Sequence, residues 1–247
     1  SLRPGPGAAY CLAPAWLDLC ENVFGYELKK YGFYSGGARI GGAAYAVVKS
    51  AVFGNRIISM PFSDEAACWF EKGATPAGQD RERLSAAFCA ALDAEAAKSG
   101  VDYSELRGGW DFLDGPASGF VKSGTCLRFV TDTSKGYAGV RKNCDGNILA
   151  NLKKADKYVA VEELSSAGAF EELYPVYLEQ MRSFGSPPLP LAYFSSLYSG
   201  GLARIFRASV DGRTAAFLSL LVHDGVFYAD INAGLREYDA YFPKIRL

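Results

Sequence analysis

The stretch that decides the fold is residues 202–231, LARIFRASVDGRTAAFLSLLVHDGVFYADI. Three runs rich in apolar residues are separated here by two Asp-Gly pairs: the runs are 202–209, 214–222 and 226–231, and the pairs are 211–212 and 224–225. Asp-Gly between apolar runs predicts tight hairpin turns, because both residues tolerate a positive φ angle. The middle run is apolar almost throughout, which is typical of a strand covered on both faces. The stretch therefore predicts an antiparallel three-stranded meander buried under helices.

Length and composition predict a globular protein with many aromatic side chains. The chain has 247 residues, 49% of them hydrophobic and 14% aromatic, which is enough for one large domain or two of about 120 residues. The net charge of −1 gives no general attraction to nucleic acid or acidic lipid, so a polyanionic partner would be held locally. No apolar run reaches the ~18 residues of a membrane span, and no secretory signal opens the chain. We therefore expect a cytoplasmic protein without membrane insertion.

Cysteine and histidine are placed unfavourably for a metal site. The six cysteines show no C-x-x-C spacing, and His223 is the single histidine. A zinc site of the usual Cys/His kind is therefore not expected, and no other metal site is predicted. Buried thiols in a reducing compartment are favoured over disulfides.

The order of the expected elements suggests duplication. In the first half we expect a helix at 16–24, strands at 26–35 and 38–50 around a glycine turn, a short strand at 57–60, a helix at 80–98, and strands at 101–108 and 119–132. In the second half we expect a strand at 159–163, helices at 167–184 and 191–197, and the meander. Both halves run from a helix into antiparallel strands, which predicts two related α/β units.

Three groups of polar residues are candidates for a functional site. Asp64 follows a strand that stops at Pro61, where it would orient or deprotonate an amine, or simply be solvated. Arg107 ends another expected strand and would either line a cleft or form a surface ion pair. Residues 128–157 carry seven cationic and three acidic side chains. That excess favours either a phosphate contact or a solvated helix face.

Several short motifs, taken in order, resemble the FemAB-like peptidyltransferases of the GNAT acyltransferase superfamily. The motifs are VFGNRIISMPF at 52–62, ELR at 105–107, LKKADK at 152–157, YPVY at 174–177 and MRSFGSPPLP at 181–190. They span most of the chain, and the resemblance extends to FemAB-like proteins of exopolysaccharide and protein-sorting loci. The resemblance implies an α+β (mixed α/β) fold of two tandem GNAT-like units, 1–132 and 133–247, which face a shared cleft. Their sheets would be mixed, largely antiparallel and flanked by helices. Relatives continue beyond Leu247, so the second unit is expected to be C-terminally incomplete.

The resemblance also implies an activity. In this family an aminoacyl group passes from a tRNA ester to an amine of a peptidoglycan precursor, or an acyl group passes to another envelope or exopolysaccharide component. Such a transfer needs a positioned amine, removal of its proton and donors for the oxyanion. The expected partners are a small-molecule or envelope-precursor substrate and tRNA, without DNA. No cofactor is expected apart from the donor substrate, which is aminoacyl-tRNA or acyl-CoA.

Carried over to this chain, the resemblance assigns roles to seven residues. Asp64 would hold the amine, and Tyr228 on the last meander strand would donate to a carbonyl unless it is a core tyrosine. Arg107 and Arg182 would bind substrate anions. The substrate-binding set is completed by Ser186, Lys153 and Lys154.

One departure weighs against acetyl-CoA as the donor. GNAT units that use coenzyme A carry a Q/R-x-x-G-x-G/A loop whose N–H groups bind the pyrophosphate. After Ile231 this chain has NAGLREY at 232–238, which does not fit. Two alternatives to the leading hypothesis stay open: a non-catalytic binding module for an envelope sugar or peptide, and an acetyl-CoA-dependent N-acetyltransferase.

Overall fold

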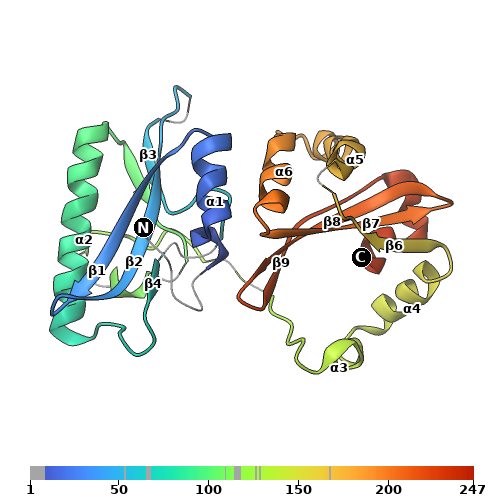
Figure 1. Ribbon diagram of the computed structural model, residues 1–247, viewed down its shortest axis with the longest axis horizontal. Helices are drawn as coiled ribbons and strands as arrows, with labels where there is room; N and C mark the ends of the chain where they lie inside the picture. Colours follow the sequence, from blue (N-terminus) through green and yellow to red (C-terminus); the bar gives the residue numbers. More distant parts are fainter. Residues whose placement is uncertain are drawn as a thin grey trace. The chain divides into compact units, whose positions relative to one another are not determined.

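The computed structural model divides the chain into two compact units, each with its own sheet (Figure 1). It describes residues 9–52, 54–64, 68–108, 110–113, 118–125, 127, 129–166 and 168–247. The first unit comprises Ser1–Lys122 with His223–Val226, and the second comprises Ser123–Val222 with Phe227–Leu247. The predicted mixed α/β class, with two sheets flanked by helices, is confirmed.

The sheet of the first unit is mixed. Its strands are β1 (Glu27–Ser35), β2 (Ala38–Val48), β3 (Arg56–Ile58), β4 (Cys68–Phe70) and β5 (Tyr103–Glu105). The order is β1-β2-β3-β5, with β4 paired to β2; β3 and β5 are parallel and the other pairs are antiparallel. The β1–β2 turn uses Gly36 and Gly37, both at positive φ, as the glycine doublet predicts.

Strand β2 forms the centre of this sheet. Every residue from Gly41 to Val48 is buried, so both faces of the strand are covered. A Cβ atom at Gly41 would lie 2.4 Å from the carbonyl oxygen of Trp69. Glycine is therefore required where β4 crosses close to β2.

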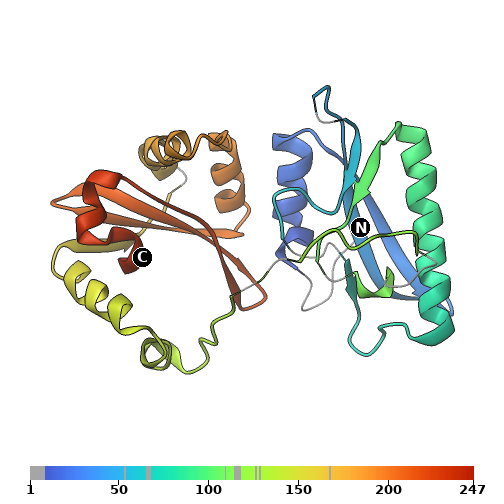
Figure 2. The same cartoon turned by 180° about the vertical axis from the view of Figure 1, so that it is seen from behind.

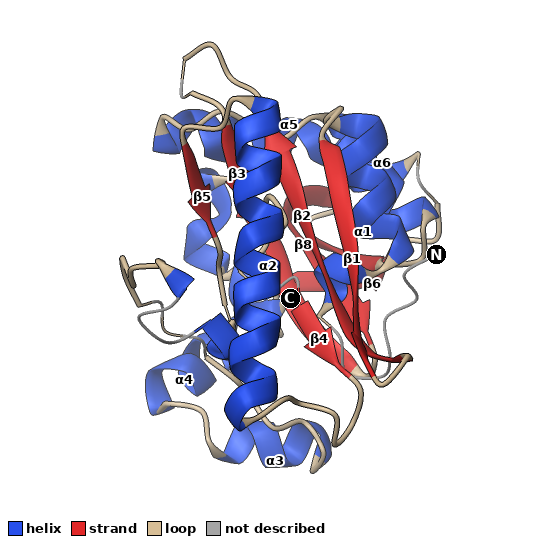
Figure 3. Ribbon diagram, turned by 90° about the vertical axis from the view of Figure 1, so that its left-hand side faces the viewer, coloured by secondary structure: helices blue, strands red, loops and turns tan. Residues whose placement is uncertain are grey.

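Helices cover both faces of the first sheet (Figures 1 and 2). They are η1 (Tyr10–Leu12), α1 (Pro14–Asp18), the π-helical turn η2 (Leu19–Val23), α2 (Gly78–Ser99) and η3 (Asp111–Leu113). Figure 3 shows α2 lying along the strands, where Phe88 makes edge-to-face contacts with Tyr31 and Phe33. The predicted helix at 80–98 is confirmed, and it ends at Gly100 in the left-handed conformation.

The sheet of the second unit contains the predicted meander. Its strands are β6 (Val159–Glu163), β7 (Ala203–Val210), β8 (Arg213–His223) and β9 (Val226–Gly234), in the order β6-β7-β8-β9. Asp211 and Gly212 have φ angles of 49° and 75°, and Asp224 and Gly225 have φ angles of 48° and 74°. Two central residues at positive φ define the tight hairpin turn that Asp-Gly predicts.

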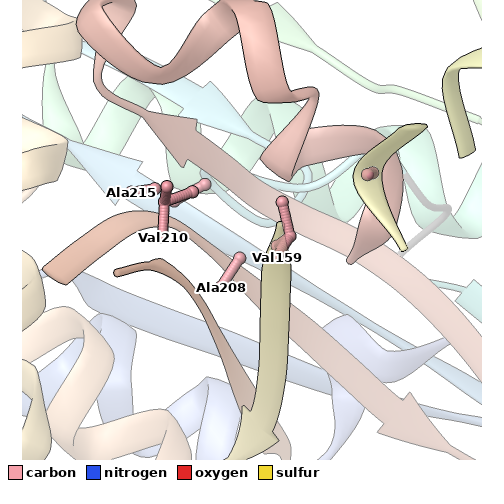
Figure 4. Packing of buried hydrophobic residues seen from close by; sticks show 6 residues of the cluster. Val159, Ala208, Val210 and Ala215 are labelled. Atoms are coloured by element: carbon pink, nitrogen blue, oxygen red, sulfur yellow. The ribbon is translucent and has the colours of Figure 1, made fainter. Parts of the chain in front are cut away.

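Helices also lie on both sides of the second sheet (Figures 1 and 2). They are α3 (Gly136–Lys142), α4 (Gly146–Ala155), α5 (Ala169–Phe184), α6 (Leu191–Ser199), η5 (Arg236–Tyr241) and α7 (Pro243–Arg246). On one side α6 packs on β8 through Phe194 and Phe217, with ring centroids 6.2 Å apart. A separate core cluster consists of small buried side chains, among them Ala155. Figure 4 labels four of its members, Val159, Ala208, Val210 and Ala215.

One predicted strand is wrong. The described residues between 119 and 132 form no strand, and Val121, Phe129 and Val130 are 87%, 94% and 82% exposed. Their side chains favour a pleated surface, but no neighbouring strand supplies the hydrogen bonds, so tertiary context overrides the local preference. Two residues of this segment, Cys126 and Arg128, lie outside the described residues, as does Ala167 at the expected start of α5. Within the described part of the chain, no helix is long and apolar enough to span a membrane.

Candidate functional site

A carboxylate lies in the middle of the last meander strand. The side chain of Asp230 on β9 accepts a 2.9 Å hydrogen bond at Oδ1 from the hydroxyl of Tyr193 on α6. Its Oδ2 accepts a 3.2 Å hydrogen bond from the hydroxyl of Ser219 on β8. Aspartate is disfavoured inside strands, so its presence here requires a specific reason. Three elements of the second unit therefore meet at one carboxylate.

Burial determines the electrostatics of this group. Loss of water around Asp230 raises the pKa of its carboxyl from 3.8 to about 6, and the hydrogen bonds from Tyr193 and Ser219 oppose that rise. Tyr193 and Ser219 are each 1% exposed, whereas Asp230 keeps partial exposure. A carboxyl group with a pKa of about 6 is mostly ionised at neutral pH and can still accept a proton readily. It is therefore suited to general base catalysis.

Tyr228 precedes Asp230 by two residues on β9. Because side chains alternate along a strand, residues two apart face the same side of the sheet. Both side chains are partly buried. The predicted carbonyl donor and the carboxylate thus share one strand, although sequence analysis identified Tyr228 alone.

The C-terminal end of α5 carries Arg182 and Ser186. Gly185 is left-handed, and the N–H groups of Gly185 and Ser186 donate to the carbonyls of Arg182 and Met181, a Schellman motif. Ser186 is exposed. Arg182 Nη1 is also exposed and lies 3.1 Å from a carboxylate oxygen of Glu179, so it is engaged in a surface ion pair.

The connection after this helix end is held by two tyrosines of α5. The hydroxyl of Tyr174 donates to the carbonyl of Leu189 over 2.9 Å, and the N–H of Leu189 donates to the hydroxyl of Tyr177 over 3.0 Å. Both main-chain groups of Leu189 are therefore satisfied. This anchors the segment that carries Ser186.

The two predicted lysines lie in the last turn of α4. Lys153 and Lys154 are both exposed, and Lys154 Nζ lies 5.2 Å from the ring centroid of Phe242. Cations in the last helical turn are favoured by the helix dipole. The two side chains present positive charge on the surface of the second unit.

The remaining two candidates belong to the first unit. Arg107 Nε donates to Oε1 of Glu105 over 2.6 Å, and its main-chain N–H donates to Ser59 Oγ over 2.6 Å. Its guanidinium is thus engaged in an ion pair, one of the two expectations. Asp64 is exposed and follows the buried Ser63. Residues 65–67, which come next, lie outside the described residues.

Buried thiols are poor candidates for nucleophiles. Burial raises the pKa of Cys20 and that of Cys68 to about 12, so both stay protonated at neutral pH. The cysteines that the structure describes are free thiols: Cys11, Cys20, Cys68, Cys89 and Cys144. Among the described residues, no group of three His, Cys, Asp or Glu side chains is placed to hold a metal ion.

Two main-chain donors at the end of β9 are engaged inside the protein. The N–H of Gly234 donates to Oε1 of Gln180 over 3.0 Å, and the N–H of Leu235 donates to the carbonyl of Ala215 over 2.9 Å. A pyrophosphate would need such N–H groups to point at it. The N–H of the last residue of β9 and that of the next residue are therefore not directed at a ligand.

Comparison with known proteins finds a family match within the second unit and a solved structure similar to nearly the whole chain. Residues 142–245, which contain α5, α6 and the whole meander, match the family of the acetyltransferase (GNAT) domain. The crystal structure of FemX matches with a TM-score of 0.69 at 12% sequence identity, covering 98% of this chain and 79% of the FemX chain. No curated protein matches at a significant level. Residues 142–245 are thus similar to the acetyltransferase (GNAT) domain and the chain has the fold of FemX, which confirms the predicted resemblance to FemAB-like members of the GNAT superfamily.

Proposed function

We propose that this protein transfers an acyl or aminoacyl group onto an amine, and that Asp230 is the general base. The observation that carries the proposal is the partly buried carboxylate of Asp230, held between Tyr193 and Ser219 with a pKa of about 6. Its place in the matched GNAT domain supports an acyl-transfer role.

The chemistry needs one nucleophile and one proton acceptor. The amine nitrogen of the acceptor attacks the acyl carbon, a C–N bond forms, and the bond from that carbon to the leaving oxygen or sulfur breaks. Asp230 takes the proton that the amine loses, and the leaving group then takes a proton. Tyr228 donates a hydrogen bond to the carbonyl oxygen as negative charge develops on it.

We propose an aminoacyl-tRNA ester as the donor in preference to acetyl-CoA. Both Gly234 and Leu235 have engaged N–H groups, and the segment after β9 lacks the pyrophosphate motif. The proposed acceptor is an amine of a cell-envelope, peptidoglycan or exopolysaccharide precursor, and the proposed place of action is the cytoplasm. We also propose that each of the two units is GNAT-like.

Substrate anions would be bound by residues that already form surface ion pairs. Arg182 pairs with Glu179, and Arg107 pairs with Glu105, at exposed or half-exposed positions. Such pairs contribute about 0–1 kcal/mol, so a phosphate or carboxylate displaces the partner at little cost. Ser186, Lys153 and Lys154 would add contacts in the second unit, and Asp64 is proposed as a substrate contact of the first unit.

Aminoacyl transfer under single-turnover conditions tests this proposal. The full chain is incubated with charged tRNA, or separately with acyl-CoA, together with amino-bearing envelope precursors. We expect transfer from charged tRNA, a loss of at least about 100-fold in rate in Asp230→Asn, and unchanged transfer in Asp239→Asn. Asp239 is an exposed control in η5. Transfer that is as fast in Asp230→Asn as in Asp239→Asn overturns the proposal. So does the absence of transfer from every donor tested.

A further inference from the structure

The side chain of Gln180 on α5 binds the main chain of β9 through both ends of its amide. Nε2 donates to the carbonyl of Asn232 over 3.2 Å, and Oε1 accepts from the N–H of Gly234 over 3.0 Å. These two groups flank Ala233. A residue of a parallel neighbouring strand would bind the same two main-chain groups, so the amide of Gln180 takes the place of a strand at this position.

This contact lies at an edge of the sheet. β9 is the last strand in the order β6-β7-β8-β9 within the described residues, and main-chain groups at a sheet edge are otherwise left to solvent. The same end of β9 is tightly packed, since Ala233 is fully buried. A Cβ atom at Gly234 would lie only 3.1 Å from Cγ of Lys244. The end of β9 is thus bound along its edge by Gln180 and packed against the side chain of Lys244.

We propose that Gln180 is a positioning residue that holds β9 so that Asp230 meets Tyr193 and Ser219. Asp230 lies two residues before Asn232, on the same strand that Gln180 binds. Tyr193 on α6 and Ser219 on β8 are fully buried, so movement of β9 changes their distances to the carboxylate. The catalytic meaning of this positioning rests on the proposed function, whereas the positioning itself is independent of it.

Replacement of Gln180 by methionine removes both hydrogen bonds and keeps the length of the side chain. The carbonyl of Asn232 and the N–H of Gly234 lose their partner, so we expect water to reach the end of β9 and the carboxylate of Asp230. Two titratable side chains that interact with Asp230, Tyr193 and Tyr177, are uncharged in the acidic range because tyrosine ionises near pH 10.

The experiment is a carbon-13 NMR titration of the aspartate carboxyl groups, with the Asp230 signal assigned from its absence in Asp230→Asn. Burial has a larger effect on the pKa of Asp230 than the hydrogen bonds from Tyr193 and Ser219, so entry of water outweighs the loss of those bonds. We therefore expect the titration midpoint of Asp230 in Gln180→Met to move down by about one pH unit, a tenfold change in its ionisation constant. Gln79→Met is the matched control, since Gln79 is exposed in the first unit. An Asp230 midpoint in Gln180→Met that equals the midpoint in Gln79→Met overturns the proposal.

Replacement of Gln180 by glutamate gives an internal rescue. A protonated glutamic acid offers one donor and one acceptor, as glutamine does, whereas the ionised form offers acceptors alone. We expect the backbone amide signals of β9 in this variant to match those of the native protein when both are recorded at low pH. At neutral pH we expect them to differ from the native signals, because the carbonyl of Asn232 loses its donor while the N–H of Gly234 keeps an acceptor. A difference from the native signals that is the same at both pH values contradicts the proposal. Because NMR requires no turnover, failure of acyl transfer in the Asp230 experiment leaves this result interpretable.

Discussion

Tyr193 and Asp230 are joined by a hydrogen bond of 2.9 Å from the tyrosine hydroxyl to Oδ1 of the carboxylate. The two residues are 37 positions apart and lie on different elements, α6 and β9. The bond favours the ionised carboxylate, while burial favours the neutral acid. The balance between these two effects places the titration of Asp230 just below neutral pH.

Replacement of Tyr193 by phenylalanine tests that balance. The substitution removes a hydrogen bond that stabilises the charged form but keeps the buried ring. We therefore expect the pKa of Asp230 to rise above about 6, and the pH dependence of transfer to move to higher pH with it. The same NMR titration measures the shift. Tyr198→Phe on the same helix is the control, since its hydroxyl donates to the carbonyl of Leu164, and a midpoint that moves equally in both variants would refute the expectation.

Asp230 also makes the stability of the fold depend on pH in an unusual direction. Its folded pKa is raised, so the folded state binds the proton more tightly than the unfolded state does. The stabilisation is present below the unfolded pKa of 3.8 and is lost as pH rises through about 6. The difference between these two values amounts to at most about 3 kcal/mol at neutral pH.

We therefore expect Asp230→Asn to be more stable than the native protein near pH 8 by about 1–3 kcal/mol, and not near pH 4. Urea denaturation at the two pH values measures this, with Asp239→Asn as the exposed control. A gain of equal size at both pH values would show that packing, not ionisation, distinguishes the variant.

Arg182→Ala separates substrate binding from stability. The ion pair of Arg182 with Glu179 is exposed, so we expect a stability loss of less than about 1 kcal/mol. If Arg182 binds a substrate anion, KM rises while kcat is little changed. Arg83→Ala in the first unit removes a comparable exposed i,i+3 pair and serves as the control. Unchanged KM in Arg182→Ala removes this residue from the proposed site.

Gly41→Ala tests the packing of the first unit. The added methyl would lie 2.4 Å from the carbonyl oxygen of Trp69, which is main chain and cannot rotate away. We expect a loss of about 1–3 kcal/mol in unfolding free energy as β4 is displaced from β2. Gly124→Ala, where the added methyl meets no atom within 4 Å, is the control. Equal melting temperatures for the two variants would show that β4 can move away from the added methyl group without a loss of unfolding free energy.

The meander could be predicted from sequence because its determinants are local. Asp211-Gly212 and Asp224-Gly225 fix the turns through their own backbone preferences, and the apolar runs on either side supply the strands. The strand expected at 119–132 failed for the opposite reason. Its side chains suit a strand, but pairing depends on a neighbour that sequence alone does not reveal.

The site was predicted less well than the fold. Tyr228 was proposed through the family resemblance, whereas Asp230, two residues later, was not considered. An aspartate inside an otherwise strand-like run is the available signal, because strands disfavour it. Its partners Tyr193 and Ser219 lie 37 and 11 residues away, so the contact that defines the site exists only in the folded protein.

The pH dependence of single-turnover transfer tests the central claim, that Asp230 accepts the proton of the attacking amine. We expect the native rate to increase tenfold per pH unit below about pH 6 and to level off above it, as Asp230 ionises. In Asp230→Asn this inflection should vanish together with most of the rate. An inflection near pH 6 that persists in Asp230→Asn would assign the base to another residue and contradict the account.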